Sequence, residues 1–183
     1  MRIISGIHKG RRIQAPKNLP VRPTTDMAKE ALFNILRNII HISDIKVLEL
    51  FAGSGNMSYE FASRGAGNIL AVDKHFPCIA FIKKTAEELD LPIDTIKADV
   101  FKFLENHSIK YDIIFADPPY ALESTDFLKI ADTVAENQML NEDGLLIIEH
   151  SKHTDLSEHS TFDNARRYGG TVFSFFKTTP EEN

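Results

Sequence analysis

The sequence predicts an α/β fold, in which a mostly parallel β-sheet is covered by helices on both faces. Two observations predict it. From residue 45 onward, short strand-like runs alternate with longer segments of helical periodicity. The strand-like runs are also nearly uniformly apolar, as is typical of parallel strands that are buried on both faces. In such sheets ligands bind beyond the carboxyl ends of the strands, which is where the unusual residues of this chain fall.

The first forty residues predict three elements ahead of the sheet. Residues 1–16 alternate short apolar pieces with the turn signal "HKGR" and indicate a basic β-hairpin. Residues 18–23, "NLPVRP", indicate an extended linker. Residues 24–40 predict an amphipathic helix, with Thr24 or Thr25 as its N-cap and Asp26 in its first turn. The apolar face of this helix is expected to hold Ala28, Ala31, Leu32, Ile35, Leu36 and Ile39.

The remaining residues predict the sheet and its covering helices. The expected strands are residues 45–52, 68–73, 94–100, 111–117 and 144–150. The expected helices between them are residues 57–66, 77–90, 101–108 and 124–140. Near the end, residues 164–177 are interpreted as one further strand, with "ARRYGG" leading into "TVFSFF".

Composition limits the class of protein. A chain of 183 residues, 43% hydrophobic and 26% charged, suits one globular domain with at most a small appendage. Its single cysteine, Cys78, allows no internal disulfide, fits a reducing compartment and is expected to pack as a small hydrophobe. The N-terminus lacks the apolar core of a signal peptide, and no run approaches the roughly 18 apolar residues of a membrane span. We therefore expect a cytoplasmic protein that does not bind a membrane.

The charge is distributed unevenly. The net charge of −5 argues by itself against binding to a polyanion. Residues 1–40, however, hold eight Lys or Arg and two Asp or Glu, a net charge of +6, which leaves −11 for the other 143 residues. This asymmetry suggests a nucleic-acid contact at one end of the chain. The alternative is a solvated basic surface. We divide the chain into a basic extension, residues 1–40, and a main domain, residues 41–183.

A glycine-rich turn follows the first strand of the sheet. In "LELFAGSGN", Gly53 and Gly55 are expected to let the backbone turn tightly and approach a ligand. Asp73 ends the next strand, 20 residues after Gly53, where a carboxylate typically binds ribose hydroxyls. Asp99 ends the third strand and offers an acceptor for an adenine amino group. Capping of the strand ends is the alternative role for both aspartates.

The same turn disfavours a pyrophosphate. Ser58 stands where the dinucleotide fingerprint requires a third glycine, and the turn holds no basic residue. Glu49, near the end of the first strand, adds negative charge and could hold a cationic group. An acid-lined nucleoside pocket better suits a cationic ligand such as S-adenosylmethionine.

The sequence "DIIFADPPYALE" ends a buried strand with the residues least able to continue it. Asp117 can finish the strand because a residue before proline is extended, and Pro118 and Pro119 then lead the chain out stiffly without N–H donors. This predicts a rigid corner that displays the Asp117 carboxylate and free carbonyls beside the flat face of Tyr120. Such a corner suits an exocyclic base amine, because acceptors orient its lone pair and stacking holds the base by roughly 1–3 kcal/mol. A proline-rich turn without chemistry is the alternative.

In these segments and almost end to end, the chain resembles the bacterial RsmD-type methyltransferases. "FAGSG" and "DPPY" alone indicate an amino-methyltransferase, whereas "MRIISG", "KGR", "RPTTD" and "KEALFNIL" narrow the family. The resemblance implies a Rossmann-like class I S-adenosylmethionine-dependent methyltransferase fold with a mostly parallel seven-stranded sheet. It implies methyl transfer to the exocyclic N2 amine of a guanine in 16S ribosomal RNA, guanine 966 in the family. It also implies a monomer whose partner is ribosomal RNA, within a small-subunit particle.

The resemblance assigns residues to three roles and implies no metal. The implied cofactor-binding residues are Glu49, Phe51, Ala52, Gly53, Ser54, Gly55, Asp73, Lys74, Asp99 and Val100. The implied catalytic residues, which would hold the target guanine, are Asp117, Pro118, Pro119 and Tyr120. The residues implied to meet RNA phosphates from the basic extension are Arg2, Lys9, Arg11, Arg12 and Arg22.

Other functions compete with this interpretation. A DNA adenine-N6 or protein-glutamine methyltransferase could share the proline corner, but 183 residues leave no room for a DNA target-recognition domain. An NAD-dependent oxidoreductase would leave "DPPY" unexplained, and a non-catalytic RNA-binding module would explain the basic end alone. His150, His153 and His159 could suggest a metal site, but no cysteine joins them and we expect a solvated loop.

Overall fold

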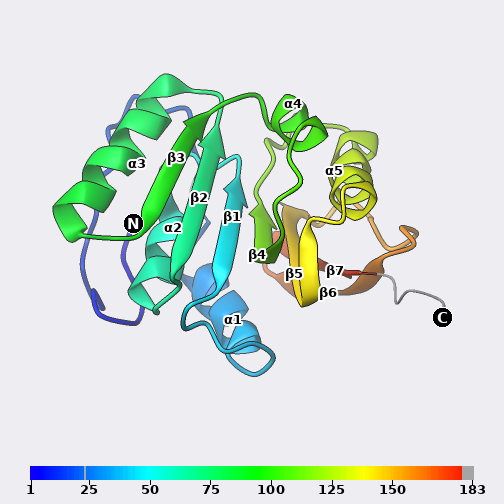
Figure 1. Cartoon of the computed structure of the whole chain (residues 1–183), viewed down its shortest axis with the longest axis horizontal. Helices are drawn as coiled ribbons and strands as arrows, with labels where there is room; N and C mark the ends of the chain where they lie inside the picture. The colour runs from blue at the N-terminus through cyan, green and yellow to red at the C-terminus, as the bar shows by residue number, and fades with distance from the viewer. Residues whose placement is uncertain (23, 179–183) are drawn as a thin grey trace.

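Seven strands form a single sheet in the computed structural model, which describes residues 1–22 and 24–178 (Figure 1). Their order across the sheet is β3-β2-β1-β4-β5-β7-β6. The first five pair in parallel, whereas β7 is antiparallel to both β5 and β6. The strands are β1 (Lys46–Leu50), β2 (Asn68–Asp73), β3 (Ile93–Lys97), β4 (Tyr111–Ala116), β5 (Leu140–Ser151), β6 (Phe162–Tyr168) and β7 (Thr171–Lys177). The predicted α/β class and seven-stranded sheet are confirmed.

Helices cover both faces of the sheet, as the apolar strands require. The helices are α1 (Asp26–Leu36), α2 (Asn56–Ser63), α3 (Phe76–Leu89), α4 (Val100–Glu105) and α5 (Ser124–Glu136). α1, α2 and α3 pack on one face, and α4 and α5 pack on the other (Figure 1). Successive residues of one strand serve the two layers: Val47 lies in the first core and Leu48 in the second, both fully buried.

The chain order creates a switch point at the middle of the sheet. From β1 the chain adds β2 and β3 on one side, and β4 and β5 then lie on the other side. The connections after β1 and β4 therefore leave in opposite directions and open a crevice at the carboxyl ends of these two strands. The glycine-rich turn follows β1, and the proline corner follows β4.

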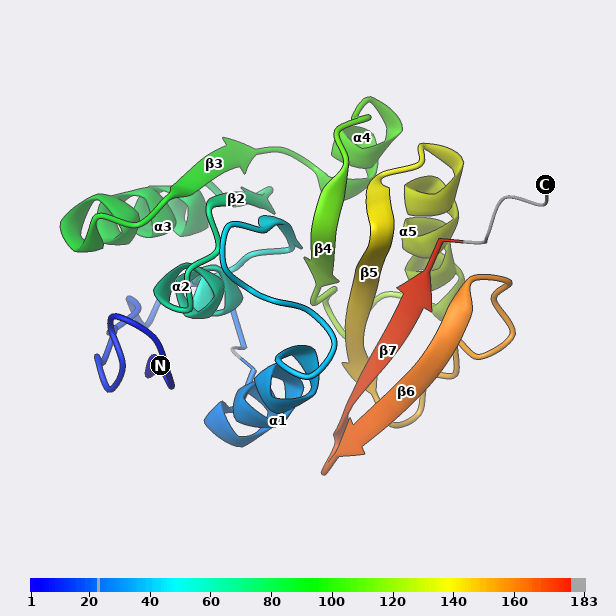
Figure 2. The same ribbon diagram turned by 60° about the horizontal axis from the view of Figure 1, so that its bottom comes forward.

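The end of the chain differs from the prediction. The single strand expected at residues 164–177 is instead an antiparallel hairpin, β6 and β7, in which Tyr168 pairs with Thr171 (Figure 2). Gly169 has a φ of 63°, a left-handed conformation that suits glycine and reverses the chain. The expected strand was therefore two strands, joined by the glycine pair.

The predicted N-terminal β-hairpin forms as a short one. The Ile3 N–H donates to the Arg11 carbonyl at 2.9 Å and the Ile13 N–H to the Met1 carbonyl at 3.0 Å, on either side of a bridge between Arg2 and Arg12. The backbone beyond these pairs bonds to α2. The N–H groups of Ile4 and Ser5 donate to the Glu60 carboxylate at 2.8 and 3.1 Å. Gly6 lies so close to α2 that an added Cβ would come within 1.7 Å of the Ser63 carbonyl oxygen. The short hairpin therefore docks beside α2 (Figure 2).

α1 begins as predicted and ends earlier. The Thr25 hydroxyl accepts from the Ala28 N–H at 3.2 Å, which confirms the N-cap. The helix ends at Leu36, and Ile39, expected on its apolar face, is 58% exposed beyond it. Phe33, which the predicted apolar face did not include, is fully buried. It packs edge-on against Phe61 of α2, with ring centroids 4.7 Å apart.

A buried ion-pair network joins α1, α2 and the N-terminal segment. The Lys29 ammonium lies 3.5 Å from the Glu60 carboxylate, and both side chains are at most 1% exposed. Burial lowers the pKa of Lys29, which Glu60 opposes. Arg64 completes the network with an Nε–carboxylate distance of 2.7 Å to Glu60. Residues 1–40 are thus packed into the same core as the sheet.

His150 does not lie in a solvated loop, contrary to the prediction. It belongs to β5, is buried, and its Nε2 lies 2.7 Å from the Ser174 hydroxyl of β7. His153 is exposed as expected, and His159 Nε2 lies 3.0 Å from the Asp132 carboxylate. Over residues 1–22 and 24–178, every helix is too short or too polar to cross a bilayer.

Candidate active site

A cavity of about 490 Å³ opens at the carboxyl ends of β1, β2 and β4. Of the fourteen residues predicted to bind the cofactor or to act in catalysis, thirteen line it, and Gly55 is the exception among the described residues. The glycine-rich turn, the end of β2, the start of α4 and the proline corner each contribute part of the wall. Residues distant in sequence therefore meet in one cavity, where the fold predicts a ligand.

The glycine-rich turn is built by backbone geometry that glycine permits. Gly53 and Gly55 have φ angles of 55° and 81°, in the left-handed region. An added Cβ on Gly53 would lie 2.9 Å from Val21, and one on Gly55 would lie 2.9 Å from both Ile82 and Tyr59. The tight turn is confirmed, but the close neighbours of both glycines are protein side chains. Gly55 is the N-cap residue of α2 and is required by packing.

Asp73 links the end of β2 to this turn. Its Oδ2 accepts from the Gly53 N–H at 2.9 Å, and its Oδ1 accepts from the His75 N–H at 2.8 Å. These bonds fix the carboxylate at the cavity wall. Asp99 lines the cavity from the start of α4, where it also caps the helix by accepting from the Lys102 N–H at 3.2 Å. Both capping and lining roles are thus present in one residue.

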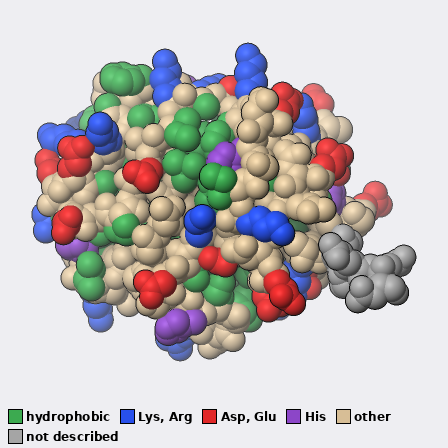
Figure 3. Space-filling view, viewed as in Figure 1, with side chains coloured by type: hydrophobic (Ala, Val, Ile, Leu, Met, Phe, Trp, Pro, Cys, Tyr) green, Lys and Arg blue, Asp and Glu red, His purple; other side chains and the backbone are tan. Residues whose placement is uncertain are grey.

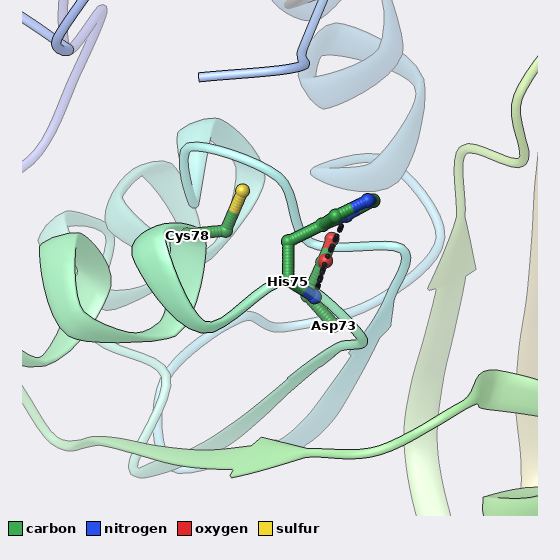
Figure 4. A group of neighbouring side chains, drawn as sticks. All are labelled: Asp73, His75 and Cys78. Atoms are coloured by element: carbon green, nitrogen blue, oxygen red, sulfur yellow. Dashed lines mark hydrogen bonds and ion pairs between the residues drawn. The ribbon is translucent and has the colours of Figure 1, made fainter. Parts of the chain in front are cut away.

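Asp73, His75 and Cys78 bring three metal-type donor atoms within 4.8 Å of one another. Figure 4 shows interactions that join Asp73 to His75 and none that reach the Cys78 sulfur. His75 Nδ1 lies 3.0 Å from the Asp73 carboxylate, so these groups already bond to each other. Burial raises the pKa of the Cys78 thiol to about 11, which disfavours the thiolate that a metal would need. We assign Asp73 and His75 to the wall of the cavity and Cys78 to the core behind it.

Three acids lie on neighbouring strands and share the face that carries α1 and α2. They are Glu49 of β1, Asp117 directly after β4, and Glu149 of β5. Burial raises the pKa of Glu49 to about 7, against hydrogen bonds from the Ser58 N–H at 2.9 Å and the Ser58 hydroxyl. Burial likewise raises the pKa of Glu149 to about 7, against a 2.5 Å hydrogen bond from the Thr24 hydroxyl. Glu49 was predicted to hold a cationic group. It also has a structural role, because it binds the first turn of α2 through Ser58.

The proline corner occupies the other side of the cavity. Burial, and then the neighbouring Glu149 and Glu49 carboxylates, raise the pKa of Asp117 well above its usual value, while Arg22 opposes the rise. The Tyr120 ring is 48% exposed, and the Arg22 guanidinium carbon lies 5.3 Å from its centroid. The corner therefore presents acceptors and an aromatic face together, which suits the binding of a planar base that carries an amine.

Sequence reasoning missed Glu149 and Thr24. Glu149 follows an apolar run in the same way as Asp73 and Asp117, so the acid at the end of "LLIIE" was the signal that could have found it. Thr24 was predicted as a helix cap, yet it donates to Glu149 across 125 residues of sequence. Nothing local in the sequence indicates that contact.

Comparison with known proteins identifies the family. A family model described as "Conserved hypothetical protein 95" matches residues 1–177. "Putative rRNA methyltransferase YlbH" of Bacillus subtilis is 34% identical over 166 residues, which cover 86% of each chain. "Ribosomal RNA small subunit methyltransferase D" of Haemophilus influenzae is 30% identical over 162 residues, 85% of this chain and 81% of the relative. The chain belongs to the RsmD-type methyltransferase family.

A solved structure supports the same assignment. "Putative methyltransferase yhhF" from Escherichia coli superposes with a TM-score of 0.82 at 25% identity and covers 96% of both chains. The RsmD-type chain thus has the class I S-adenosylmethionine-dependent methyltransferase fold over nearly its full length. The NAD-dependent oxidoreductase and the non-catalytic RNA-binding module are set aside by this family membership.

The basic residues predicted to bind RNA in this RsmD-type chain fall into three places. Arg11 and Arg12 line a groove of about 520 Å³ between residues 11–16 and α3, which Lys84 also lines. Arg2 is exposed, as is Lys9, and the Arg2 Nε lies 3.5 Å from the Asp26 carboxylate. Arg22 instead lines the cavity. On the face shown in Figure 3, basic and acidic side chains are interspersed and form no single basic patch.

Proposed function

We propose that this RsmD-type chain transfers a methyl group from S-adenosylmethionine to the exocyclic N2 amine of a guanine in 16S ribosomal RNA. Family membership supports the coarse activity, S-adenosylmethionine-dependent methylation of ribosomal RNA. The observation that carries the finer proposal is that the Asp117–Tyr120 corner and the glycine-rich turn line one cavity. A base amine held at the corner would therefore face a ligand held at the turn.

The residues of the cavity fit the cofactor. The turn holds no basic residue and is flanked by Glu49 and Asp73, which favours a cationic nucleoside over a pyrophosphate. Residues 51–55 would hold its methionine part and Asp73 its ribose, while Asp99 and Val100 would flank its adenine. S-adenosylmethionine, when bound, supplies an electrophilic methyl group.

The corner residues would prepare the amine for attack. The nitrogen of an exocyclic amine is a poor nucleophile because its lone pair is delocalised into the ring. The Asp117 carboxylate and the carbonyls freed by the two prolines would accept its two N–H groups and direct the lone pair toward the methyl group. Tyr120 would hold the base by stacking. Positioning and charge placement are thus the main catalytic contributions.

The basic extension would supply the RNA contact. We infer that Arg2, Lys9, Arg11 and Arg12, all exposed, bind phosphates of ribosomal RNA within a small-subunit particle. We also infer that the chain acts as a monomer in the cytoplasm, where such particles assemble.

The test is to identify the methylated atom. Small-subunit particles and free 16S RNA, both from a strain that lacks the enzyme, are incubated with the purified chain and isotope-labelled S-adenosylmethionine. Digested nucleosides are then separated by mass spectrometry and the modified position is mapped. We expect N2-methylguanosine at one site and none with the Asp117→Asn variant, which keeps the side-chain shape. N6-methyladenine in added DNA, or methylated glutamine in added protein, with unmodified RNA would overturn the proposal.

A further inference from the structure

Arg22 differs in position from the other basic residues of the extension. Its guanidinium carbon lies 5.3 Å from the centroid of the Tyr120 ring, at the mouth of the cavity. Arg11 and Arg12 line the separate groove beside α3. Arg22 contacts the ring proposed to bind the base, whereas Arg11 and Arg12 lie on an outer surface. Equal charge therefore does not imply that Arg22 also binds phosphate.

The backbone on both sides of Arg22 is anchored to the cavity wall. On the preceding side, the Val21 N–H donates to the Leu19 carbonyl at 2.8 Å, and the Val21 side chain packs against Gly53. On the following side, the Thr24 hydroxyl donates to Glu149, and Asn56 Nδ2 donates to the Thr24 carbonyl at 3.1 Å. Residues 19–22 and 24, which we call the wall segment, therefore hold Arg22 at the mouth.

Arg22 faces an excess of acidic groups. Among the described residues, the charged or titratable groups that act on Asp117 are Glu149 from β5, Glu49 from β1 and Arg22 from the wall segment, and Tyr120 lies on the same corner. Arg22 opposes the rise in pKa of Asp117, of Glu149 and of Tyr120. Lys74 and His75 also line the cavity, from the end of β2.

We propose that Arg22 is a positioning residue of the catalytic pocket, whose guanidinium holds the Tyr120 ring in place for the target base and serves as a counter-ion to Asp117 across the same cavity. The proposal rests on the function proposed above. A cation opposite Asp117 favours its carboxylate, the form that can accept an N–H from the amine. A cation over the face of Tyr120 fixes the ring against which the base would bind.

A phosphate contact makes different predictions. Removing one phosphate contact would reduce the slope of log affinity against log salt by about 0.7 for a single-stranded site, and it would leave the titration of Asp117 in the free protein unchanged. Removing a counter-ion would leave the salt slope unchanged and would move the titration of Asp117 in the free protein. The two roles are therefore separable without reference to the rate of methyl transfer.

The first measurement uses the free protein. The variants are Arg22→Ala and Arg22→Lys, with Arg11→Ala as the matched control from the same extension outside the cavity. Carboxyl-¹³C NMR follows the titration of Asp117, assigned by its loss in Asp117→Asn. We expect the midpoint of Arg22→Ala to move to higher pH, that of Arg22→Lys to move less, and that of Arg11→Ala to stay. An unmoved midpoint in Arg22→Ala would overturn the proposal.

The second measurement uses RNA. In single-turnover methyl transfer, the acid limb of the rate profile of Arg22→Ala should move to higher pH in step with the NMR midpoint, so that its loss of rate is larger at low pH than at high pH. Its salt slope for RNA binding should equal that of the wild type. A reduced slope with an unmoved midpoint would assign Arg22 to phosphate. If the wild type methylated no RNA while the midpoint moved, the proposed function would fail and the counter-ion role would stand.

Discussion

Replacing Glu149 by glutamine is expected to stabilise the fold at pH 8. Glu149 is 3% exposed, and burial raises its pKa from 4.5 to about 7 in the folded protein. A carboxyl group whose pKa is raised by folding favours the folded state fully below the unfolded pKa, and this contribution is lost as pH rises through the folded pKa. Above pH 7 the buried carboxylate therefore destabilises the fold. Glutamine carries no charge and keeps an oxygen that can accept from Thr24.

The magnitude follows from the two pKa values. A difference of 2.5 units between them, at about 1.36 kcal/mol per unit, corresponds to roughly 3 kcal/mol at pH 8 and to nothing below pH 4.5. The glutamine amide needs its own acceptors, which reduces the expected gain in the free energy of unfolding to about 1–3 kcal/mol. Glu49 and His150 also titrate on folding, but both are present in each protein. Removing the Glu149 charge also relieves the rise in the pKa of Asp117, which adds to the stabilisation in the same direction.

Urea unfolding at pH 4.5, 6, 7 and 8 measures this difference directly. Glu142→Gln is the matched control, since Glu142 lies on the same strand and is exposed, and it should stay within about 0.5 kcal/mol of the wild type at each pH. The stability of Glu149→Gln should rise relative to the wild type between pH 4.5 and 7 and level off above. A variant that is less stable than the wild type at pH 8, or a difference that does not change with pH, would refute this reasoning.

Three further substitutions test the packing, the base site and the RNA surface. Glu60→Gln should lower the free energy of unfolding by about 3–5 kcal/mol, because it leaves Lys29 buried without its charged partner. Urea unfolding measures this loss, and a loss under about 1 kcal/mol would contradict the role of the network. Tyr120→Ala should reduce methyl transfer by tenfold or more and leave cofactor affinity, measured by calorimetry, within about twofold; a collapse of cofactor affinity would contradict its assignment to the base. The double substitution Arg11→Ala and Arg12→Ala should weaken RNA binding and flatten its salt dependence by about 1.4, and an unchanged slope would remove these residues from the RNA surface.

Most of the sheet could be predicted because its strands are buried on both faces. The run 68–73 matches β2 residue for residue, and the expected helix 77–90 differs from α3 by one residue at each end. The proline corner and the glycine turn were also predicted to meet, because the carboxyl ends of parallel strands share one edge of the sheet. The residues of a segment were enough to predict its structure where the segment is fully buried or where Gly and Pro restrict the backbone.

The remaining differences depend on contacts between distant residues. The pairing of the N-terminal hairpin stops after Ile3 because Glu60, some 55 residues away, binds the backbone of Ile4 and Ser5. His150 is buried because Ser174 on β7 offers its ring a partner, which no pattern near residue 150 reveals. A polar residue in a buried position is thus the hardest to predict, since its partner and not its neighbours in sequence decides its place.

A continuous chain of hydrogen bonds connects the start of the basic extension to the buried acid Glu149. The Lys29 ammonium donates to the Arg2 carbonyl at 2.6 Å and to Asn56 Oδ1 at 2.8 Å. Asn56 in turn donates to the Thr24 carbonyl, and the Thr24 hydroxyl donates to Glu149. Deleting residues 1–40 would therefore remove one wall of the cavity and leave buried polar groups unpaired, whatever happens to RNA binding. A loss of activity in such a truncation would not distinguish RNA contact from collapse of the pocket, and only surface substitutions such as those at Arg11 and Arg12 can separate the two.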